Sequence, residues 1–166
     1  MGDRVFRVLI ADDDVNLREL LTESIREWGY DTGVARDGKE AFGKILAEKY
    51  DIVICDMKMP GIDGLKLLEK IREHDKDILV IVITGYSSLE SAVKAIEAGA
   101  YDYLAKPFKL DELMVIMKNA RALLGLTARN RELIEELKRA YGEIDALKGM
   151  LAGMEGEGSG SKGPEQ

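Results

Sequence analysis

A short apolar run that ends in an acidic residue limits the possible folds of this chain more than any other feature. Residues 52–55, Ile-Val-Ile-Cys, are too few for a helix and rich in β-branched side chains, which indicates a strand buried on both faces of a parallel sheet. Asp56 follows at once, and Pro60, Gly61 and Gly64 then require a loop. Either Asp56 only begins this loop, or it lies in the crevice at the carboxyl ends of the strands, where open α/β sheets bind ligands.

Length, charge and cysteine content exclude several classes of protein. The 166 residues suffice for one domain and an extension, but not for two full domains. A net charge of -7 argues against nucleic acid as a direct partner of this segment, because phosphate binding needs a basic face. The single cysteine fits the reducing cytosol. Since neither a membrane span nor a signal peptide is recognisable, we expect a cytoplasmic protein that does not bind a membrane.

The remaining apolar runs predict four more strands, at residues 8–11, 32–35, 78–83 and 102–105. Between the runs, apolar residues recur at the three- and four-residue spacing of helices that bury one face. Strand and helix therefore alternate with short connections, which favours a parallel sheet with right-handed crossovers. The expected fold is a doubly wound α/β domain over residues 1–124, with five parallel strands and helices on both faces.

Capping residues mark three of the predicted helix starts. Asp14 is placed to cap the helix that follows the first strand. Asp37 with Glu40, and Ser87 with Glu90, have the spacing of a capping box, in which each residue satisfies a backbone N–H of the other. These signals place the first, second and fourth helices.

The residues after the predicted domain follow a heptad pattern. Position a falls on residues 116, 123, 130, 137, 144 and 151, and position d on residues 119, 126, 133, 140 and 147. This unbroken repeat predicts that the last helix of the domain continues as a long amphipathic helix over residues 125–152. Either the helix pairs with a second copy, or it is a solvated single helix whose apolar stripe packs on its own domain.

Details of the pattern favour a parallel homodimer through this helix. Asn130 at an a position would fix the register, and Glu143 and Lys148 occupy a g position and the following e position, as a parallel pair requires. Gly142 costs roughly 1 kcal/mol relative to alanine, and other glycines weaken the coiled coil in the same way. Residues 153–166 turn to Gly, Ser, Glu and Lys, which indicates a flexible tail.

Polar residues able to do chemistry follow four of the five predicted strands: Asp12 and Asp13, Asp56, Thr84, and Lys106. The carboxyl ends of parallel strands meet at one edge of the sheet, so these side chains are expected to lie close together. Two carboxylates about 4 Å apart repel by about 4 kcal/mol at an effective dielectric constant of about 20, so three of them need a cation. Oxygen ligands favour a hard divalent ion such as Mg²⁺ over zinc.

Such a site matches the needs of phosphoryl transfer, which are in-line positioning and neutralisation of the phosphoryl oxygens. Asp56 would be the nucleophile, because carboxylates form acyl phosphate intermediates. Nucleotide binding is disfavoured, since no Gly-x-Gly-x-x-Gly or Walker pattern follows any predicted strand.

Four segments together resemble the receiver domain of two-component response regulators: residues 9–14 (LIADDD), 55–64 (CDMKMPGIDG), 83–86 (ITGY) and 101–108 (YDYLAKPF). The resemblance covers about residues 5–124 and implies the flavodoxin-like strand order 2-1-3-4-5. The sequences of residues 83–86 and 99–103 are similar to the corresponding segments in receivers of enhancer-binding (NtrC-like) activators. In those proteins a coiled helix follows the receiver. No Walker-type ATPase sequence and no helix-turn-helix follow here, so either an output domain lies outside this sequence or the protein acts alone.

The resemblance implies a phosphorylation site with a metal ion. Asp56 resembles the phosphoacceptor that takes a phosphoryl group from a sensor histidine kinase. Asp13 resembles the direct ligand of Mg²⁺ (or Mn²⁺), with Asp12 acting through water and the backbone carbonyl of Lys58 completing the protein ligands. Asp14 stands where the family more often has Glu, but either acid is able to cap the helix.

The resemblance also implies a conformational switch. Thr84 would contact the phosphoryl group and shift on activation, Tyr103 resembles the aromatic residue that follows it inward, and Lys106 would pair with the phosphoryl group. The bond between Lys106 and Pro107 is typically cis in this family. Tyr86, two residues after Thr84, stands at a position that tunes the lifetime of the phosphoryl group.

The chain is therefore expected to be a regulatory phosphoacceptor and not an enzyme. One alternative is a haloacid-dehalogenase-like phosphatase, in which Asp12 is the nucleophile and Thr84 and Lys106 belong to later motifs. Those enzymes need a further acidic cluster near the end of the core. Another alternative is a scaffold in which the receiver is inert and the coiled coil carries the function.

Overall fold

Five parallel strands form a sheet at the centre of the N-terminal part of the chain. The computed structural model describes residues 4–85, 88–158 and 163. The strands are β1 (Arg7–Ala11), β2 (Asp31–Ala35), β3 (Ile52–Cys55), β4 (Leu79–Thr84) and β5 (Asp102–Ala105). They pair in the order β2-β1-β3-β4-β5, and every pairing is parallel. The predicted doubly wound fold and its strand order are confirmed.

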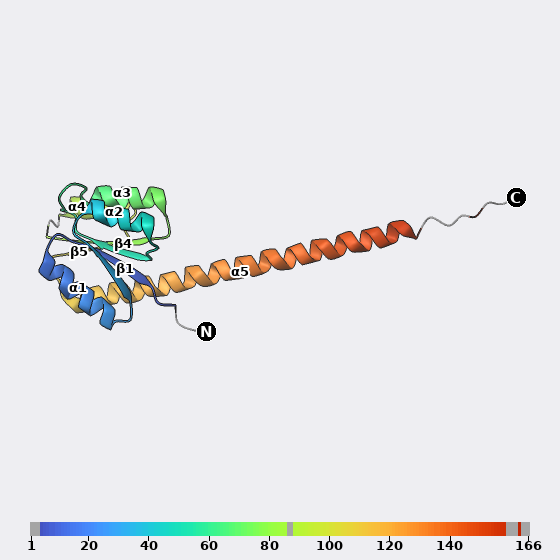
Figure 1. Ribbon diagram of the computed structural model, residues 1–166, viewed down its shortest axis with the longest axis horizontal. Helices are drawn as coiled ribbons and strands as arrows, with labels where there is room; N and C mark the ends of the chain where they lie inside the picture. Colours follow the sequence, from blue (N-terminus) through green and yellow to red (C-terminus); the bar gives the residue numbers. More distant parts are fainter. Residues whose placement is uncertain (1–3, 86–87, 159–162, 164–166) are drawn as a thin grey trace. The chain divides into compact units, whose positions relative to one another are not determined.

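Helices cover both faces of this sheet: α1 (Val15–Glu27), α2 (Gly38–Ala47), α3 (Gly64–His74), α4 (Leu89–Glu97) and α5 (Leu110–Glu157). Helix α1 and the first part of α5 lie on one face, and α2, α3 and α4 lie on the other (Figure 1). All four residues of β3 are therefore buried, as the apolar run predicts. Among the described residues, no helix combines the length and the apolar character that crossing a bilayer would require.

Asp14 and Asp37 cap the first two helices as predicted, while the Glu40 carboxylate, which was expected to complete a capping box with Asp37, pairs with Arg36. The Asp14 carboxylate accepts hydrogen bonds from the backbone N–H groups of Asn16 and Leu17, and the Asp37 carboxylate accepts one from Glu40. The third signal was assigned to the wrong pair.

Helix α4 is capped by Ser88, whose capping-box partner is Ser91 and not Glu90. The helix begins one residue later than expected, so Ser91 occupies the third helical position and its hydroxyl accepts the bond that a Glu carboxylate would accept. Ser87 lies outside the described residues.

The chain divides into two compact units, Met1–Ala122 and Leu123–Gln166. Helix α5 continues through the boundary and ends at Glu157, five residues inside the segment expected to be a flexible tail. A helix that is already formed adds residues at little cost, so glycines near its end do not stop it. In the second unit the large apolar side chains at the a and d positions are between 41% and 65% exposed: Leu123, Leu126, Leu133, Leu137, Ile144, Leu147 and Leu151.

Candidate phosphorylation site

The register of the sheet brings the predicted site residues to one edge. Ala11 of β1 pairs with Cys55 of β3, so Asp12 and Asp56 leave adjacent strands at the same level. The Asp56 N–H continues this pairing by donating to the Ala11 carbonyl at 3.1 Å. In the pair formed by β4 and β5, the Lys106 N–H, directly after β5, donates to the Thr84 carbonyl at the end of β4 at 2.9 Å.

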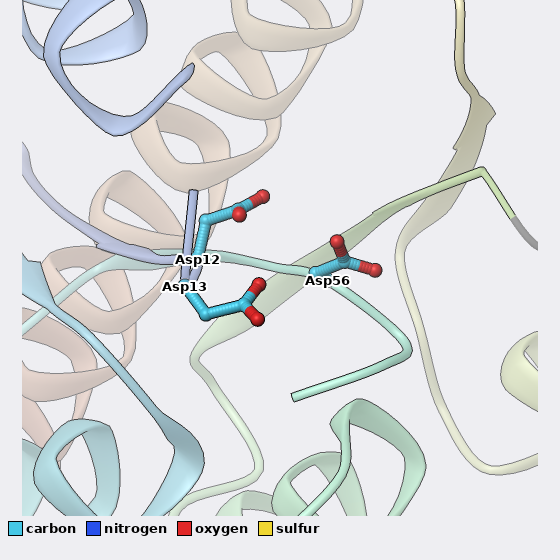
Figure 2. Close-up of side chains that lie close together, drawn as sticks. All are labelled: Asp12, Asp13 and Asp56. Atoms are coloured by element: carbon cyan, nitrogen blue, oxygen red, sulfur yellow. The ribbon is translucent and has the colours of Figure 1, made fainter. Parts of the chain in front are cut away.

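Three carboxylates gather at this edge, as predicted. Asp12, Asp13 and Asp56 each have an oxygen within 4.8 Å of the others, and Figure 2 shows the three side chains close together. Asp12 and Asp56 are buried, while Asp13 is exposed. Like charges this close repel strongly, so the cluster requires a cation.

Lys106 supplies one cation. Its ammonium lies 2.7 Å from the Asp56 Oδ2 and 3.3 Å from the Asp12 Oδ2. Burial alone would lower the pKa of Lys106, but the hydrogen bonds and charges of Asp56 and Asp12 raise it on balance. Burial raises the pKa of the Asp12 carboxyl, although the Asp14 N–H and Lys106 oppose the change. Lys106 thus forms ion pairs with Asp12 and Asp56, and Asp13 belongs to neither pair.

Backbone N–H groups orient the two buried acids. The Asp12 Oδ1 accepts a hydrogen bond from the Asp14 N–H at 2.8 Å. The Asp56 Oδ1 accepts one from the Lys58 N–H at 3.1 Å, which fixes the start of the loop after β3. That loop returns against β3 at Gly64, where an added Cβ would lie 2.8 Å from the Met57 Cα and overlap the Asp56 carbonyl. Only glycine therefore allows the approach seen here.

The donor set fits a hard divalent ion. Three carboxylates within reach of one another offer the oxygen ligands that Mg²⁺ prefers, and one of them is solvent-accessible. The neighbouring Cys55 lies outside this group of ligands, because its side chain is fully buried in the apolar core, and this burial raises the pKa of its thiol to about 12. The Lys58 N–H contacts Asp56, and the role of the Lys58 carbonyl as a ligand stays a prediction.

The two predicted switch residues lie on neighbouring strands. Thr84 is fully buried at the end of β4, next to Ala105 of β5. Tyr103 is half-buried, and its hydroxyl lies 3.1 Å from the Ser91 Oγ. Sequence reasoning did not select Ser91, although its place three residues after Ser88 is the spacing of a cap. Tyr86 lies outside the described residues.

The peptide bond between Lys106 and Pro107 is cis, as expected. It follows β5 directly and belongs to the segment that presents the Lys106 side chain to the two buried acids.

The chain is similar in sequence to known regulatory proteins. It is 36% identical over 135 residues to the regulatory protein AtoC of Escherichia coli strain K12, and the aligned residues cover 81% of this chain and 29% of AtoC. It is 35% identical over 153 residues to the C4-dicarboxylate transport transcriptional regulatory protein DctD of Pseudomonas aeruginosa, covering 92% of this chain and 33% of DctD. The chain thus spans a third or less of the length of these relatives.

Solved structures share the fold. A CheY-like response regulator receiver domain protein from Methanospirillum hungatei has a TM-score of 0.72 at 30% identity, over 75% of this chain and 99% of that one. NtrX from Brucella abortus has a TM-score of 0.72 at 32% identity, over 78% of this chain and 30% of NtrX. These matches agree with the resemblance to receivers of NtrC-like activators. Residues 8–118, which contain the acidic cluster and Lys106, match the response regulator receiver domain, and the chain belongs to that family.

Proposed function

We propose that the chain is a phosphorylation-activated signalling switch whose Asp56 accepts a phosphoryl group from a sensor histidine kinase in the cytoplasm. An Asp56 carboxylate oxygen attacks the phosphorus, a new O–P bond forms, and the bond from phosphorus to the imidazole nitrogen breaks with its electron pair going to the imidazole. The observation that carries this proposal is the Lys106 ammonium, 2.7 Å from Asp56 within a cluster of three acids. This cation is placed to pair with the oxygens of an incoming phosphoryl group.

A divalent metal ion, Mg²⁺ or Mn²⁺, would be held by Asp13 and Asp56 directly, by Asp12 through water, and by the Lys58 carbonyl. When bound, the ion would neutralise negative charge on the phosphoryl oxygens. Asp12 and Asp56 each accept a backbone N–H and the Lys106 ammonium, but the Asp12 side chain is 4% exposed and that of Asp56 is 11% exposed, so Asp12 is the less accessible candidate for the nucleophile. This arrangement supports a phosphoacceptor over a phosphatase that uses Asp12.

Phosphorylation adds roughly 1.5 to 2 negative charges at Asp56. In our proposal Thr84 and Lys106 move toward these charges, and Tyr103 rotates into the space that Thr84 vacates. The surface formed by α4, β5 and the start of α5 changes as a result. Such a switch needs only two packings that differ by a few kcal/mol.

The second unit would carry this change to a dimer. Its exposed apolar stripe matches the a and d positions of a parallel coiled coil, and Asn130 at an a position would set the register. The net charge of -7 makes direct nucleic acid binding by this segment unfavourable, so the output passes through a partner or a further domain.

Mass spectrometry after incubation with Mg²⁺ and acetyl phosphate tests the assignment. We expect the mass of one added phosphoryl group on the wild-type chain and none on Asp56→Asn. EDTA should prevent the addition, and Asp12→Asn should reduce it without moving the modified residue. Labelling that survives Asp56→Asn would refute the assignment, and turnover of a phosphomonoester that Asp12→Asn abolishes would support the phosphatase alternative.

A further inference from the structure

A small pocket lies where the turn between α1 and β2 meets the first part of α5. Six side chains line it: Trp28 and Tyr30 from the turn, and Met114, Met117, Lys118 and Arg121 from α5. The turn leads into the start of β2, so the pocket lies at the amino ends of the parallel strands. The acidic cluster follows the carboxyl ends, and the pocket is therefore separate from the phosphorylation site.

The pocket has the size and the walls for one aromatic ring. Its volume is about 160 Å³, and a cavity of about 150 Å³ is able to hold a benzene molecule. Trp28 is half-buried and Met117 is buried, so the walls are well packed. An indole ring and methionine sulfur both make favourable contacts with a further aromatic ring. A larger ligand does not fit, since drug-sized sites start at about 300 Å³.

The charged part of the lining is cationic. Lys118 and Arg121 are three residues apart on α5 and therefore neighbours on its surface, and none of the described residues that line the pocket carries a carboxylate. The Arg121 Cζ lies 5.6 Å from the centroid of the Tyr30 ring, which holds the guanidinium at the pocket. Within the described part of the chain, neither cation forms an ion pair with a carboxylate. Both are therefore available to an anion.

The end of α1 opposes an anion only weakly. A helix C-terminus carries partial negative charge on its free carbonyl groups. Here the Gly29 N–H donates to the Arg26 carbonyl at 3.0 Å, and the Tyr30 N–H donates to the Ile25 carbonyl at 3.2 Å. These turn groups satisfy two of the last carbonyls. Glu27, the last residue of α1, is exposed and lies outside the lining, so the lining itself is positively charged on a chain whose net charge is -7.

We propose that this pocket binds a small aromatic carboxylate, with the ring against Trp28 and Met114 and the carboxylate on Lys118 and Arg121. The ligand needs neither a metal ion nor phosphorylation, so the site is additional to the proposed function and does not depend on it. A bound molecule would contact the end of α1 and the first part of α5 at once and hold the two helices together.

The indole N–H of Trp28 reports binding directly. Trp28 is the single tryptophan, so this group gives one signal in a ¹H–¹⁵N spectrum of the full chain. Titration with 4-methylbenzoate should shift the signal with a dissociation constant of about 1 mM or lower. The neutral 4-methylbenzamide keeps the ring and should bind roughly three- to tenfold more weakly, because it loses charge-assisted hydrogen bonds at a partly exposed site. Acetate keeps the charge without the ring and should bind more than about tenfold more weakly.

Lys118→Gln tests the recognition of charge. It should weaken the binding of 4-methylbenzoate roughly threefold and leave the binding of 4-methylbenzamide unchanged, because only the first ligand pairs with the ammonium. The matched control is Lys39→Gln, which removes the same charge from an exposed lysine on α2 outside the pocket and should change neither ligand.

Met114→Ser tests the apolar wall. It should weaken both ring-bearing ligands at least about threefold, because it removes apolar surface that the ring covers. Met150→Ser, at a side chain that is 67% exposed in the second unit, is the control and should change neither. Thermal unfolding shows whether each variant keeps its fold, and the comparison of the three ligands on the wild-type chain needs no variant.

No shift of the Trp28 signal at about 10 mM 4-methylbenzoate, tenfold above the expected dissociation constant, would overturn the proposal. Equal binding of 4-methylbenzoate and 4-methylbenzamide would also overturn it, since the cations would then not recognise a carboxylate. A difference between these two ligands that Lys118→Gln leaves intact has the same meaning. If acetate binds as tightly as 4-methylbenzoate, the pocket does not hold a ring and the proposal is wrong.

Discussion

The Ser91 hydroxyl lies 3.1 Å from the Tyr103 hydroxyl and also completes the capping box of α4. One oxygen therefore joins the start of a helix to the aromatic residue proposed to move in the switch. Because Ser91 takes part in both interactions, a change at the α4 N-terminus alters the surroundings of the Tyr103 ring.

Ser91→Ala tests this link against Ser88→Ala. Both variants lose capping hydrogen bonds, so each should lower the free energy of unfolding by about 1 kcal/mol. Only Ser91→Ala also removes the Tyr103 contact, so only this variant should shift or broaden the fluorine NMR signal of fluorotyrosine at position 103. Tyr103→Phe assigns that signal by deleting it. Equal changes in both serine variants would mean that the hydroxyl contact does not hold the ring.

Gly64→Ala should destabilise the fold because the new methyl group meets the backbone of Asp56 and Met57. We expect a loss of about 1–3 kcal/mol in the free energy of unfolding, measured by urea titration. Gly43→Ala is the matched control, since nothing lies within 4 Å of a Cβ there and the residue is inside α2. That variant should instead gain about 0.5–1 kcal/mol.

Tyr30 should make stability depend on alkaline pH. Burial raises the pKa of its phenol, with Arg121 opposing the change, and the hydroxyl donates to the Met117 carbonyl at 3.0 Å. The contribution is complete below the unfolded pKa of about 10 and is lost as pH rises through the higher folded pKa.

Urea unfolding of Tyr30→Phe from pH 7 to 11 measures this contribution. At pH 7 the variant should lose about 0.5–1.5 kcal/mol with the hydrogen bond, and above pH 10 its stability should fall less steeply than that of the wild type. Tyr50, whose pKa burial also raises, is present in both proteins and cancels in the comparison. Parallel curves at all pH values would contradict the prediction.

Leu137→Asp should weaken self-association if the second unit forms the proposed coiled coil. Leu137 is 58% exposed in the single chain, and burying it in a seam would contribute about 1.5–3 kcal/mol. Sedimentation equilibrium should therefore show a dissociation constant at least about tenfold higher. Leu46→Asp, on α2 and 56% exposed, is the control and should leave the dissociation constant unchanged. Association that tolerates Leu137→Asp would argue against this seam.

The sheet and its acidic edge follow from sequence because the signals are local. The run ending at Asp56 has the composition of a buried strand, and the parallel arrangement then forces strand ends together. The pairing of one lysine with two acids is a matter of side-chain geometry between strands, which only the structure supplies. Ser91 was missed for a related reason, since Glu90 offered a familiar spacing from Ser87 and one residue of offset changed the partner.

Cys55 gives the molecule an internal probe of its own opening. It is the single cysteine, it is fully buried in the strand that carries Asp56, and its thiol has a pKa of about 12. A thiol reagent can therefore modify the protein only when the packing over this strand opens. The rate of modification reports the free energy of that local opening, and comparing it with and without a phosphoryl donor reports how far phosphorylation changes the stability of the core beside Asp56.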